Sequence, residues 1–280
     1  MSPILIGNHK EIPIAKAEVM GILNITPDSF YSGSRVQDME VLKSAENMLN
    51  QGALILDIGG QSTRPGAEIL NADQEWDRIK NPVEQIRNTF PSAWLSVDTF
   101  HAEVARRSID IGVDIINDIS FGNDDKEMMS VVSGKCVTYI GMHKRGNAKT
   151  MQNLTSYSSI TDEVLAFLKS QSSKFIEAGV KNVWIDPGFG FAKTIDQNFD
   201  LINGLSKICN DYPSVLAGIS RKSSIYKTLN ISAEDALNGT TFMHGFLLSA
   251  GVKILRVHDV KEAVEACTLF KKIASNTPKT

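Results

Sequence analysis

Three polar residues of this chain follow short apolar segments at equivalent points. Asp98 and Asp186 each come directly after such a segment, and Asn117 comes after a third. A carboxylate can accept two hydrogen bonds from adjacent N–H groups, and a carboxamide can both donate and accept. A single aspartate in such a position more often caps a helix or faces solvent. The repetition in three separate segments favours a binding site, provided that the fold brings the segment ends together.

Cationic side chains and N–H donors follow other segments of the same kind. Lys222 comes shortly after one of them, and Arg256 and His258 come after another. Anionic groups such as phosphates are bound by positive charge and N–H donors. A single histidine is more often packed or exposed without a ligand, but a place two residues from Arg256 favours a phosphate contact. These residues predict an anion site beside the carboxylates.

Eight short apolar segments precede these polar residues, and the stretches between them have helical spacing. Continuous β-branched and aliphatic segments are typical of buried parallel strands. After the fifth segment, for example, Ile160, Val164, Phe167 and Leu168 recur on one face of a helix. Eight strands alternating with helices predict a (β/α)8 TIM barrel, in which functional residues lie at the carboxyl ends of the strands. The predicted strands are 19–23, 54–56, 94–97, 114–116, 136–142, 183–185, 215–220 and 254–255.

Turn residues and terminal segments complete the predicted domain. Glycine in a left-handed conformation often ends a helix, and four glycines stand between a helical stretch and the next strand. They are Gly52, Gly112, Gly179 and Gly251. Residues 1–18 are typical of two short strands around a turn, an N-terminal β-hairpin that we expect to close the bottom of the barrel. Residues 272–280 form a polar tail that we expect to fray, so the sequence predicts one domain over residues 1–280.

The composition excludes several classes of protein. The 280 residues carry a net charge of −3, without the basic stripe that nucleic-acid binding requires. The three cysteines are far apart and form neither a zinc-binding spacing nor a disulfide framework, as is typical of a reducing compartment. No apolar run approaches the length of a membrane span, and the N-terminus lacks the apolar core of a signal peptide. We therefore expect a soluble cytoplasmic enzyme without a nucleic-acid or membrane partner.

Longer motifs surround the polar residues. MGILNITPDSF occupies residues 20–30, and DIGGQSTRPGA occupies residues 57–67. Five shorter motifs follow in order: SVDT at 96–99, INDI at 116–119, DPGFGF at 186–191, SRKS at 220–223 and RVHD at 256–259. These seven motifs, in this order, resemble those of the dihydropteroate synthases and span nearly the whole chain. One match could be accidental, whereas seven in register are specific.

The resemblance implies a reaction and a set of pterin contacts. Dihydropteroate synthases join 4-aminobenzoate to the methylene carbon of a dihydropterin diphosphate and release pyrophosphate, a step of folate biosynthesis. The resemblance implies that Asp186 and Asn117 bind the hydrogen-bonding edge of the pterin. Asp98 would contact the pterin and stabilise positive charge developing on the methylene carbon. Lys222 would meet the ring oxygen and N5, and Arg256 would lie over the ring face.

The resemblance also implies sites for magnesium, diphosphate and aminobenzoate. Asn24 matches the family's Mg²⁺ ligand, and one protein ligand with phosphate oxygens and waters is normal for this ion. Diphosphate would contact Arg64, Arg256 and His258. Aminobenzoate would contact Thr63, Arg64, Pro65, Phe191 and Ser223. The residues expected to act in catalysis are Asp98, Thr63, Arg64 and Lys222.

Loop closure and dimerisation are two further expectations. The loops at residues 26–35 and 63–67 would fold over the site and exclude water, which would compete with the arylamine for an electrophilic carbon. By resemblance we expect a homodimer, and the amphipathic seventh and eighth helices offer an apolar interface, with four of the apolar side chains in the seventh. Those side chains could equally pack on the barrel. They are Phe242, Phe246, Leu247 and Leu248.

Some residues near the motifs are expected to have structural roles. Asp57 would brace a loop, and Asp118 and Asp259 would cap the helices that follow them. The family is a sulfonamide target, but residues 31–34 and Ala192 depart from its usual pattern and leave sulfonamide sensitivity open.

Two alternatives fit the same barrel. A pterin-binding methyltransferase that passes a methyl group to a corrinoid protein would need no diphosphate site. A catalytically silent pterin-binding protein would carry lesions in the motif loops. The intact motifs around Asn24, Lys222 and Arg256 favour the synthase.

Overall fold

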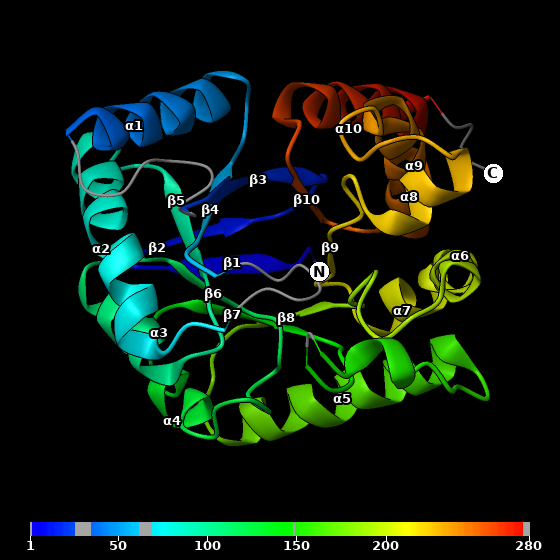
Figure 1. Cartoon of the computed structure of the whole chain (residues 1–280), viewed down its shortest axis with the longest axis horizontal. Coiled ribbons are helices and arrows are strands. Elements are labelled where there is room, and N and C mark those ends of the chain that lie inside the picture. The colour runs from blue at the N-terminus through cyan, green and yellow to red at the C-terminus, as the bar shows by residue number, and fades with distance from the viewer. Residues whose placement is uncertain (1, 26–34, 62–68, 148, 277–280) are drawn as a thin grey trace.

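Eight parallel strands form a barrel at the centre of the molecule, with helices around it (Figure 1). The computed structural model describes residues 2–25, 35–61, 69–147 and 149–276. The strands are hydrogen-bonded in the order β8-β7-β6-β5-β4-β3-β10-β9, and a bridge between Ile185 and Val215 joins the two ends of this sheet. The predicted (β/α)8 barrel is therefore confirmed. The strands are β3 (Glu18–Asn24), β4 (Ile55–Gly59), β5 (Trp94–Asp98), β6 (Ile115–Asp118), β7 (Thr138–Met142), β8 (Val183–Asp186), β9 (Leu216–Ala217) and β10 (Ile254–Val257).

Helices connect successive strands, and the connection after β7 also contains a short 3-10 helix at Met151–Asn153. Two connections carry two helices each: α6 and α7 follow β8, and α8 and α9 follow β9. The four predicted turn glycines have φ angles of 99° (Gly52), 88° (Gly112), 92° (Gly179) and 108° (Gly251), in the left-handed region expected for helix ends. The helices are α1 (Arg35–Asn50), α2 (Ala72–Thr89), α3 (Ala102–Asp110), α4 (Met128–Val132), α5 (Ile160–Glu177), α6 (Ile195–Asn203), α7 (Leu205–Asp211), α8 (Ser223–Leu229), α9 (Leu237–Ala250) and α10 (Val260–Ser275).

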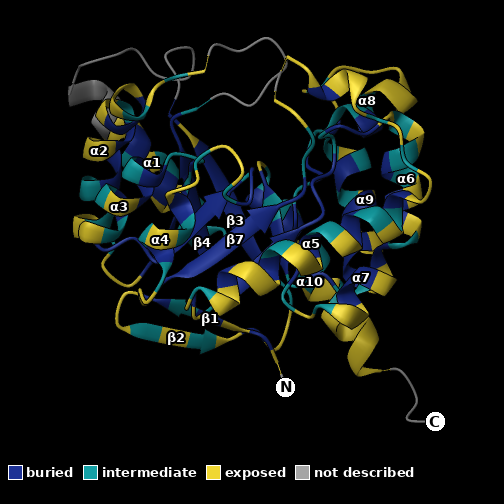
Figure 2. Cartoon of the chain, turned by 90° about the horizontal axis from the view of Figure 1, so that it is seen from below, coloured by how far each residue is buried: buried dark blue, intermediate teal, exposed yellow. Residues whose placement is uncertain are grey.

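An N-terminal hairpin closes one end of the barrel, as predicted. Strands β1 (Ile4–Gly7) and β2 (Lys10–Pro13) pair antiparallel and lie beneath the buried central strands (Figure 2). The Trp184 indole donates to the carbonyl of Ile4 at 3.0 Å, and Thr138 Oγ1 both accepts from Ile6 N and donates to Ile6 O. Leu5 is completely buried in the apolar floor that these contacts cover.

The apolar floor contains one residue from each barrel strand. These eight residues are Met20, Ile55, Trp94, Ile115, Ile140, Trp184, Leu216 and Ile254. Side chains alternate between the two faces of a strand, so residues two and four positions further along also face the interior. Counting by two from the floor reaches polar residues near the carboxyl end on most strands. They are Asn24, Asp57, Ser96, Asp98, Asn117, Asp186 and Arg256. The polar layer of the barrel therefore follows directly from strand periodicity.

Three details differ from the sequence-based expectations. Helix α10 continues to Ser275, so the first residues of the predicted polar tail are helical. Leu247 and Leu248 pack in the core, whereas Phe242 and Phe246 on the same helix are exposed. The seventh strand is shorter than predicted, because it contains only residues Leu216–Ala217. Among the described residues, no helix has both the length and the apolar character needed to cross a bilayer.

Candidate active site

Arg256 on β10 is the centre of the polar cluster at the carboxyl end of the barrel. Its Nε donates to Asp57 Oδ2 at 2.6 Å, and its terminal nitrogen donates to Asp98 Oδ2 at 2.6 Å. Asn117 Nδ2 donates to the same Asp57 oxygen at 3.1 Å. Asp57 therefore braces two predicted ligand residues, whereas we had expected it to brace a loop. Its second oxygen, Oδ1, is buried and has no hydrogen-bond partner among the described residues.

Asp98 and Arg256 perturb each other's ionisation. Burial raises the pKa of Asp98 to about 7, and the nearby Asp57 and Asp118 add to this effect, while Arg256 opposes it. Burial alone would lower the pKa of Arg256, but the attraction of Asp57 and Asp98 outweighs it and raises that pKa. The carboxylates of Asp57 and Asp98 thus share the guanidinium of Arg256. Without Lys222, this cluster contains more acidic than basic side chains.

Asp186 at the end of β8 has one oxygen held by the chain that follows it. Gly188 N donates to Asp186 Oδ1 at 2.7 Å. Within the described residues, no donor lies within hydrogen-bond distance of the other oxygen, Oδ2. Burial raises the pKa of this carboxyl, and Gly188 N–H, Lys222 and Arg256 counteract it. Asp186 is therefore a buried carboxylate with an acceptor available to a ligand.

Lys222 reaches the same cluster from the turn after β9. Its Nζ donates to the carbonyl of Phe189 at 2.7 Å and lies 4.4 Å from the centre of the Phe191 ring. Burial lowers the pKa of Lys222 to about 8, and Asp186 opposes this effect. The preceding residue, Arg221, has a φ of 52° and forms a two-bond ion pair with Asp259, each bond 2.8 Å. This anchored left-handed turn directs Lys222 into the barrel mouth, which is the opening at the carboxyl ends of the strands. It also places Ser223 at the start of α8.

Asn24 lies beside Asp98 across Gly59. A β-carbon placed on Gly59 would be 3.7 Å from Asn24 Oδ1 and 3.8 Å from Asp98 Oδ2. Two oxygen atoms, from β3 and β5 on the two sides of β4, therefore flank one small residue at this end of the barrel. Oxygen ligands are those that Mg²⁺ prefers. Among the described residues there is no group of three or more His, Cys, Asp or Glu side chains suited to a metal ion, so an ion here would depend on substrate oxygens and water.

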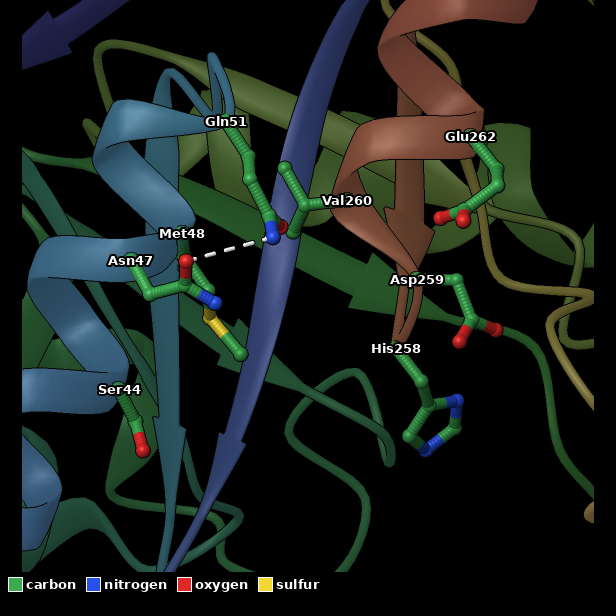
Figure 3. A pocket seen from close by; sticks show the side chains of 8 residues that line it. All are labelled: Ser44, Asn47, Met48, Gln51, His258, Asp259, Val260 and Glu262. Atoms are coloured by element: carbon green, nitrogen blue, oxygen red, sulfur yellow. Dashed lines mark hydrogen bonds between the residues drawn. The ribbon is translucent and has the colours of Figure 1, made fainter.

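His258 lies at the edge of the cluster and bonds to Ser220. Its Nδ1 is 3.0 Å from Ser220 Oγ, and burial together with the charge of Arg256 lowers its pKa to about 4. The ring also borders a pocket of about 260 Å³ between α1 and the start of α10 (Figure 3). Two of the residues that line this pocket, Asp259 and Glu262, are acidic. The pocket therefore does not suit an anion such as a diphosphate.

The structure brings most of the predicted site residues to one end of the barrel. Thr63, Arg64 and Pro65, with most of the loops at 26–35 and 63–67, lie outside the described residues. The described ones that gather at the mouth are Asn24, Asp98, Asn117, Asp186, Phe191, Lys222, Ser223, Arg256 and His258. Their positions agree with a shared site, and their individual roles stay predictions.

The two aspartates predicted to cap helices have other partners. Asp118 accepts hydrogen bonds from Ser120 N and Gly122 N, each at 2.7 Å, and from the Tyr139 hydroxyl at 2.8 Å. It therefore holds a turn, not a helix end. Asp259 stands at the N-cap position of α10, but its side chain makes no cap hydrogen bond because it pairs with Arg221. The capping predictions were wrong, although both residues are structural.

One buried pair near Asp186 was not foreseen from the sequence. Lys193 is 5% exposed, and its Nζ lies 3.0 Å from Nδ1 of the buried His143. Lysine is rarely buried, and Lys193 stands seven residues beyond the end of β8. The sequence therefore gave no indication that this side chain would be buried. The departure at Ala192 has a structural consequence: its φ of 49° lies in the left-handed region, where glycine fits without strain.

Comparison with known proteins agrees with this geometry. The family model described as "Pterin binding enzyme" matches residues 20–258. The dihydropteroate synthase of Haemophilus influenzae is 36% identical over 275 residues, covering 97% of this chain and 99% of that protein. The solved structure of Xanthomonas albilineans dihydropteroate synthase with 4-aminobenzoic acid has a TM-score of 0.90 at 32% identity, covering 99% of this chain and 100% of that chain. The Yersinia pestis dihydropteroate synthase, solved as a sulfonamide drug complex, has a TM-score of 0.88 at 33% identity, covering 97% and 99%.

Proposed function

The chain belongs to the dihydropteroate synthases, the pterin-binding transferases that join 4-aminobenzoate to a dihydropterin diphosphate in folate biosynthesis, and we propose that the barrel mouth does this with the residues described above. One observation carries the proposal. Asp98, Asp186, Lys222 and Arg256 converge at one end of the barrel, so carboxylates suited to the pterin edge lie beside cations suited to a diphosphate.

The pterin binds against the polar layer of the barrel. Asp186 accepts from the adjacent N–H groups of the 2-amino-4-oxo edge through its free oxygen, and Asn117 meets the neighbouring donor and acceptor positions. The bond from Asn117 Nδ2 to Asp57 supports this role, because it orients the amide. Lys222 Nζ meets the ring oxygen and N5, and Arg256 lies over the ring face.

The diphosphate lies at the outer side of Arg256, next to His258 and Asn24. Because the pKa of His258 is lowered to about 4, the ring is neutral at pH 7. The Ser220 hydroxyl lies 3.0 Å from Nδ1, and when it donates to this nitrogen the single ring proton is on Nε2 and available to a phosphate oxygen. The side-chain oxygen of Asn24 beside Gly59 fits a hard cation, and Asn24 would hold Mg²⁺, which would neutralise charge on the leaving diphosphate when bound.

4-Aminobenzoate binds on the side of Phe191, Lys222 and Ser223, with Thr63, Arg64 and Pro65 completing that subsite. The Phe191 ring supports this placement, because its apolar face lies 4.4 Å from Lys222 Nζ and therefore next to the pterin that this ammonium contacts. A sulfonamide that resembles 4-aminobenzoate would compete for the same subsite.

The reaction proceeds by dissociation of the diphosphate. The C–O bond breaks with its electron pair leaving on pyrophosphate, the pterin methylene becomes a resonance-stabilised cation, and the amine then forms the C–N bond and loses a proton. Asp98, held by Arg256, stabilises the cation, while positioning replaces acid–base catalysis because an arylamine is already unprotonated at neutral pH. Positional isotope exchange in the diphosphate without 4-aminobenzoate tests this order; exchange that depends strictly on the second substrate would contradict it.

Pyrophosphate release tests the function itself. The proposal expects release that requires the dihydropterin diphosphate, 4-aminobenzoate and Mg²⁺ together, with dihydropteroate formed in equal amount. Asp98→Asn should reduce turnover, since the carboxylate that faces the cation is lost. A matched control is Asp200→Asn, on the outer helix α6, which should keep the wild-type rate. Release without the arylamine, or independent of Mg²⁺, would reject the assignment.

A homodimer is expected through the exposed aromatic face of α9 and α10. Phe242 and Phe246 are 66% and 49% exposed, their rings lie 5.1 Å apart, and Leu269 on the adjacent α10 is 66% exposed. Contiguous apolar side chains of this kind are typical of an interface. Phe242→Glu should therefore convert a dimer to a monomer in analytical ultracentrifugation, whereas Ile176→Glu, at an exposed position on α5, should leave the dimer intact. A wild-type protein that sediments as a monomer would contradict the expectation.

The reaction is assigned to the cytoplasm. Cys136, Cys209 and Cys267 are free thiols, and such sparse unpaired cysteines suit a reducing compartment.

A further inference from the structure

Lys193 is a buried amine for which the proposed reaction has no role. Its Nζ lies 3.0 Å from His143 Nδ1, 2.8 Å from the carbonyl oxygen of Gly188 and 3.0 Å from that of Phe191. An ammonium group has three N–H donors, so these three acceptors match it completely. Lys193 therefore ties both ends of the turn at 188–191 to the end of β7.

This turn carries contacts of the two residues that face the pterin. Gly188 N donates to Asp186 Oδ1 at 2.7 Å, and the carbonyl of Phe189 accepts from Lys222 Nζ at 2.7 Å. Gly188 and Gly190 have φ angles of 72° and 82°, so the turn uses backbone conformations that are open mainly to glycine. A turn of such flexible residues needs restraints from outside, and Lys193 supplies two of them.

The charge of Lys193 also acts on Asp186. Burial raises the pKa of Asp186, and the Gly188 N–H, Lys222, Arg256 and Lys193 each lower it. Removal of the Lys193 charge would therefore raise the pKa of Asp186 further and favour its neutral form. A neutral carboxyl accepts hydrogen bonds from the pterin edge less strongly.

Other charged groups near Lys193 set its own ionisation. Burial lowers the pKa of Lys193 to about 7, Asp186 opposes this, and the positive charges of Lys222 and Arg145 add to it. Burial and the charge of Lys193 lower the pKa of His143 to about 2, so this ring is neutral and its Nδ1 can accept from the Lys193 ammonium. Asp186 is thus the acidic group that offsets the buried amine.

Taking the proposed function as its premise, we propose that Lys193 is a positioning residue of the pterin site. It ties the turn at 188–191 so that Asp186 and Lys222 remain directed at the pterin, and its charge keeps Asp186 ionised. Lys193 itself touches no substrate and acts through Asp186 and Lys222, which do.

The test measures binding of 6-hydroxymethylpterin by fluorescence titration between pH 5 and pH 8, with the full chain. Lys193→Met should raise the dissociation constant at pH 7 by about 10-fold or more, as loss of a supporting contact commonly does. It should also shift the acid midpoint of binding to higher pH, since Asp186 then protonates more readily. Lys193→Gln retains N–H donors without the charge; it should recover part of the affinity but keep the shifted midpoint.

Lys10→Met is the matched control at the other end of the barrel. Lys10 also donates to a carbonyl, that of Ala93 at 2.9 Å, and pairs with Asp114 at 3.1 Å. Its loss should leave both the dissociation constant and the pH midpoint at the wild-type values.

Three results would overturn the inference. The first is pterin binding by Lys193→Met within twofold of wild type, and the second is an unchanged pH midpoint in both Lys193 variants. The third is failure of both variants to fold, because Lys193 would then support the barrel instead of the site. Absence of pterin binding by the wild-type chain would reject the proposed function, which separates that failure from failure of the inference.

Discussion

The two ends of the barrel each contain buried aspartates with cationic partners, but the hydrogen-bonding capacity of their carboxylate oxygens is filled to different degrees. At the hairpin end, Asp114 Oδ2 accepts from Arg87 at 2.6 Å, from Leu95 N at 2.9 Å and from Lys10 at 3.1 Å. Its Oδ1 accepts from Asn8 N at 3.1 Å. Both carboxylate oxygens are thus occupied by groups of the chain itself.

At the mouth, the carboxylates are incompletely paired by the described residues. Among the described residues, Asp57 has one buried oxygen without a hydrogen bond, and Gly188 N is the only hydrogen-bond donor to the carboxylate of Asp186. Burial raises the pKa values of Asp98 and Asp186, which means that their charged forms are held at a cost in stability. A fully paired buried carboxylate indicates a structural role, and an incompletely paired group at a strand end indicates a site awaiting a ligand.

The largest predicted effect is on stability and concerns Asp114, the fully paired aspartate at the hairpin end. Asp114→Asn leaves Arg87 and Lys10 without their buried partner, so the free energy of unfolding should fall by about 3–5 kcal/mol. Urea denaturation measures this change. The kcat/KM of the folded protein should stay within about threefold of wild type, since no mouth residue contacts Asp114. A large loss of kcat/KM with unchanged stability would reverse the assignment of the two ends.

The next largest predicted effect is on kcat/KM and concerns Asp186, an incompletely paired aspartate at the mouth. Asp186→Asn removes a carboxylate that accepts from the pterin, so kcat/KM for the dihydropterin diphosphate should fall about 10²–10³-fold, or about 3–4 kcal/mol. The free energy of unfolding should be unchanged or higher, because a poorly paired buried charge is removed. Steady-state kinetics and urea denaturation on the same preparation measure both quantities. Strong destabilisation with retained kcat/KM would contradict the prediction.

The smallest predicted effect is on the pH dependence of stability and concerns Glu75, a buried carboxyl group behind the mouth. Glu75 on α2 accepts from the Thr99 hydroxyl at 2.8 Å, its Oε1 is buried without a partner in the described part of the chain, and burial raises its pKa to about 8. The folded protein therefore holds this proton more strongly than the unfolded chain does. The stabilisation is complete below about pH 4, falls as the pH rises, and is lost above about pH 8.

Glu75→Gln removes this pH dependence. Relative to wild type, the variant should gain stability as the pH rises from 5 to 8.5, by at most about 1.4 kcal/mol per pH unit, measured by urea denaturation at each pH. Glu103→Gln is a control on the surface of α3, where the glutamate pairs with two arginines and its pKa is lowered to about 2. A stability difference between wild type and Glu75→Gln that stays constant over this range would show that Glu75 is already ionised.

Much of the fold was visible in the sequence because local chemistry determines it. Buried parallel strands are continuously apolar, and glycine is favoured where a helix ends in a left-handed residue, so strand number and turn positions could be predicted. The polar residues at Asn24, Asp98 and Asp186 were visible for the same reason, since they interrupt the apolar strand pattern. The identity of the family followed from motifs, not from these physical patterns.

The sequence by itself determined which residues carry the charges and at which strand ends they stand. Only the tertiary structure decided their partners: the guanidinium of Arg256 shared between Asp57 and Asp98, Arg221 paired with Asp259, and Lys193 buried against His143. These pairs join residues tens to hundreds of positions apart. Their geometry depends on barrel closure and on how each turn directs a side chain, and no local preference contains that information.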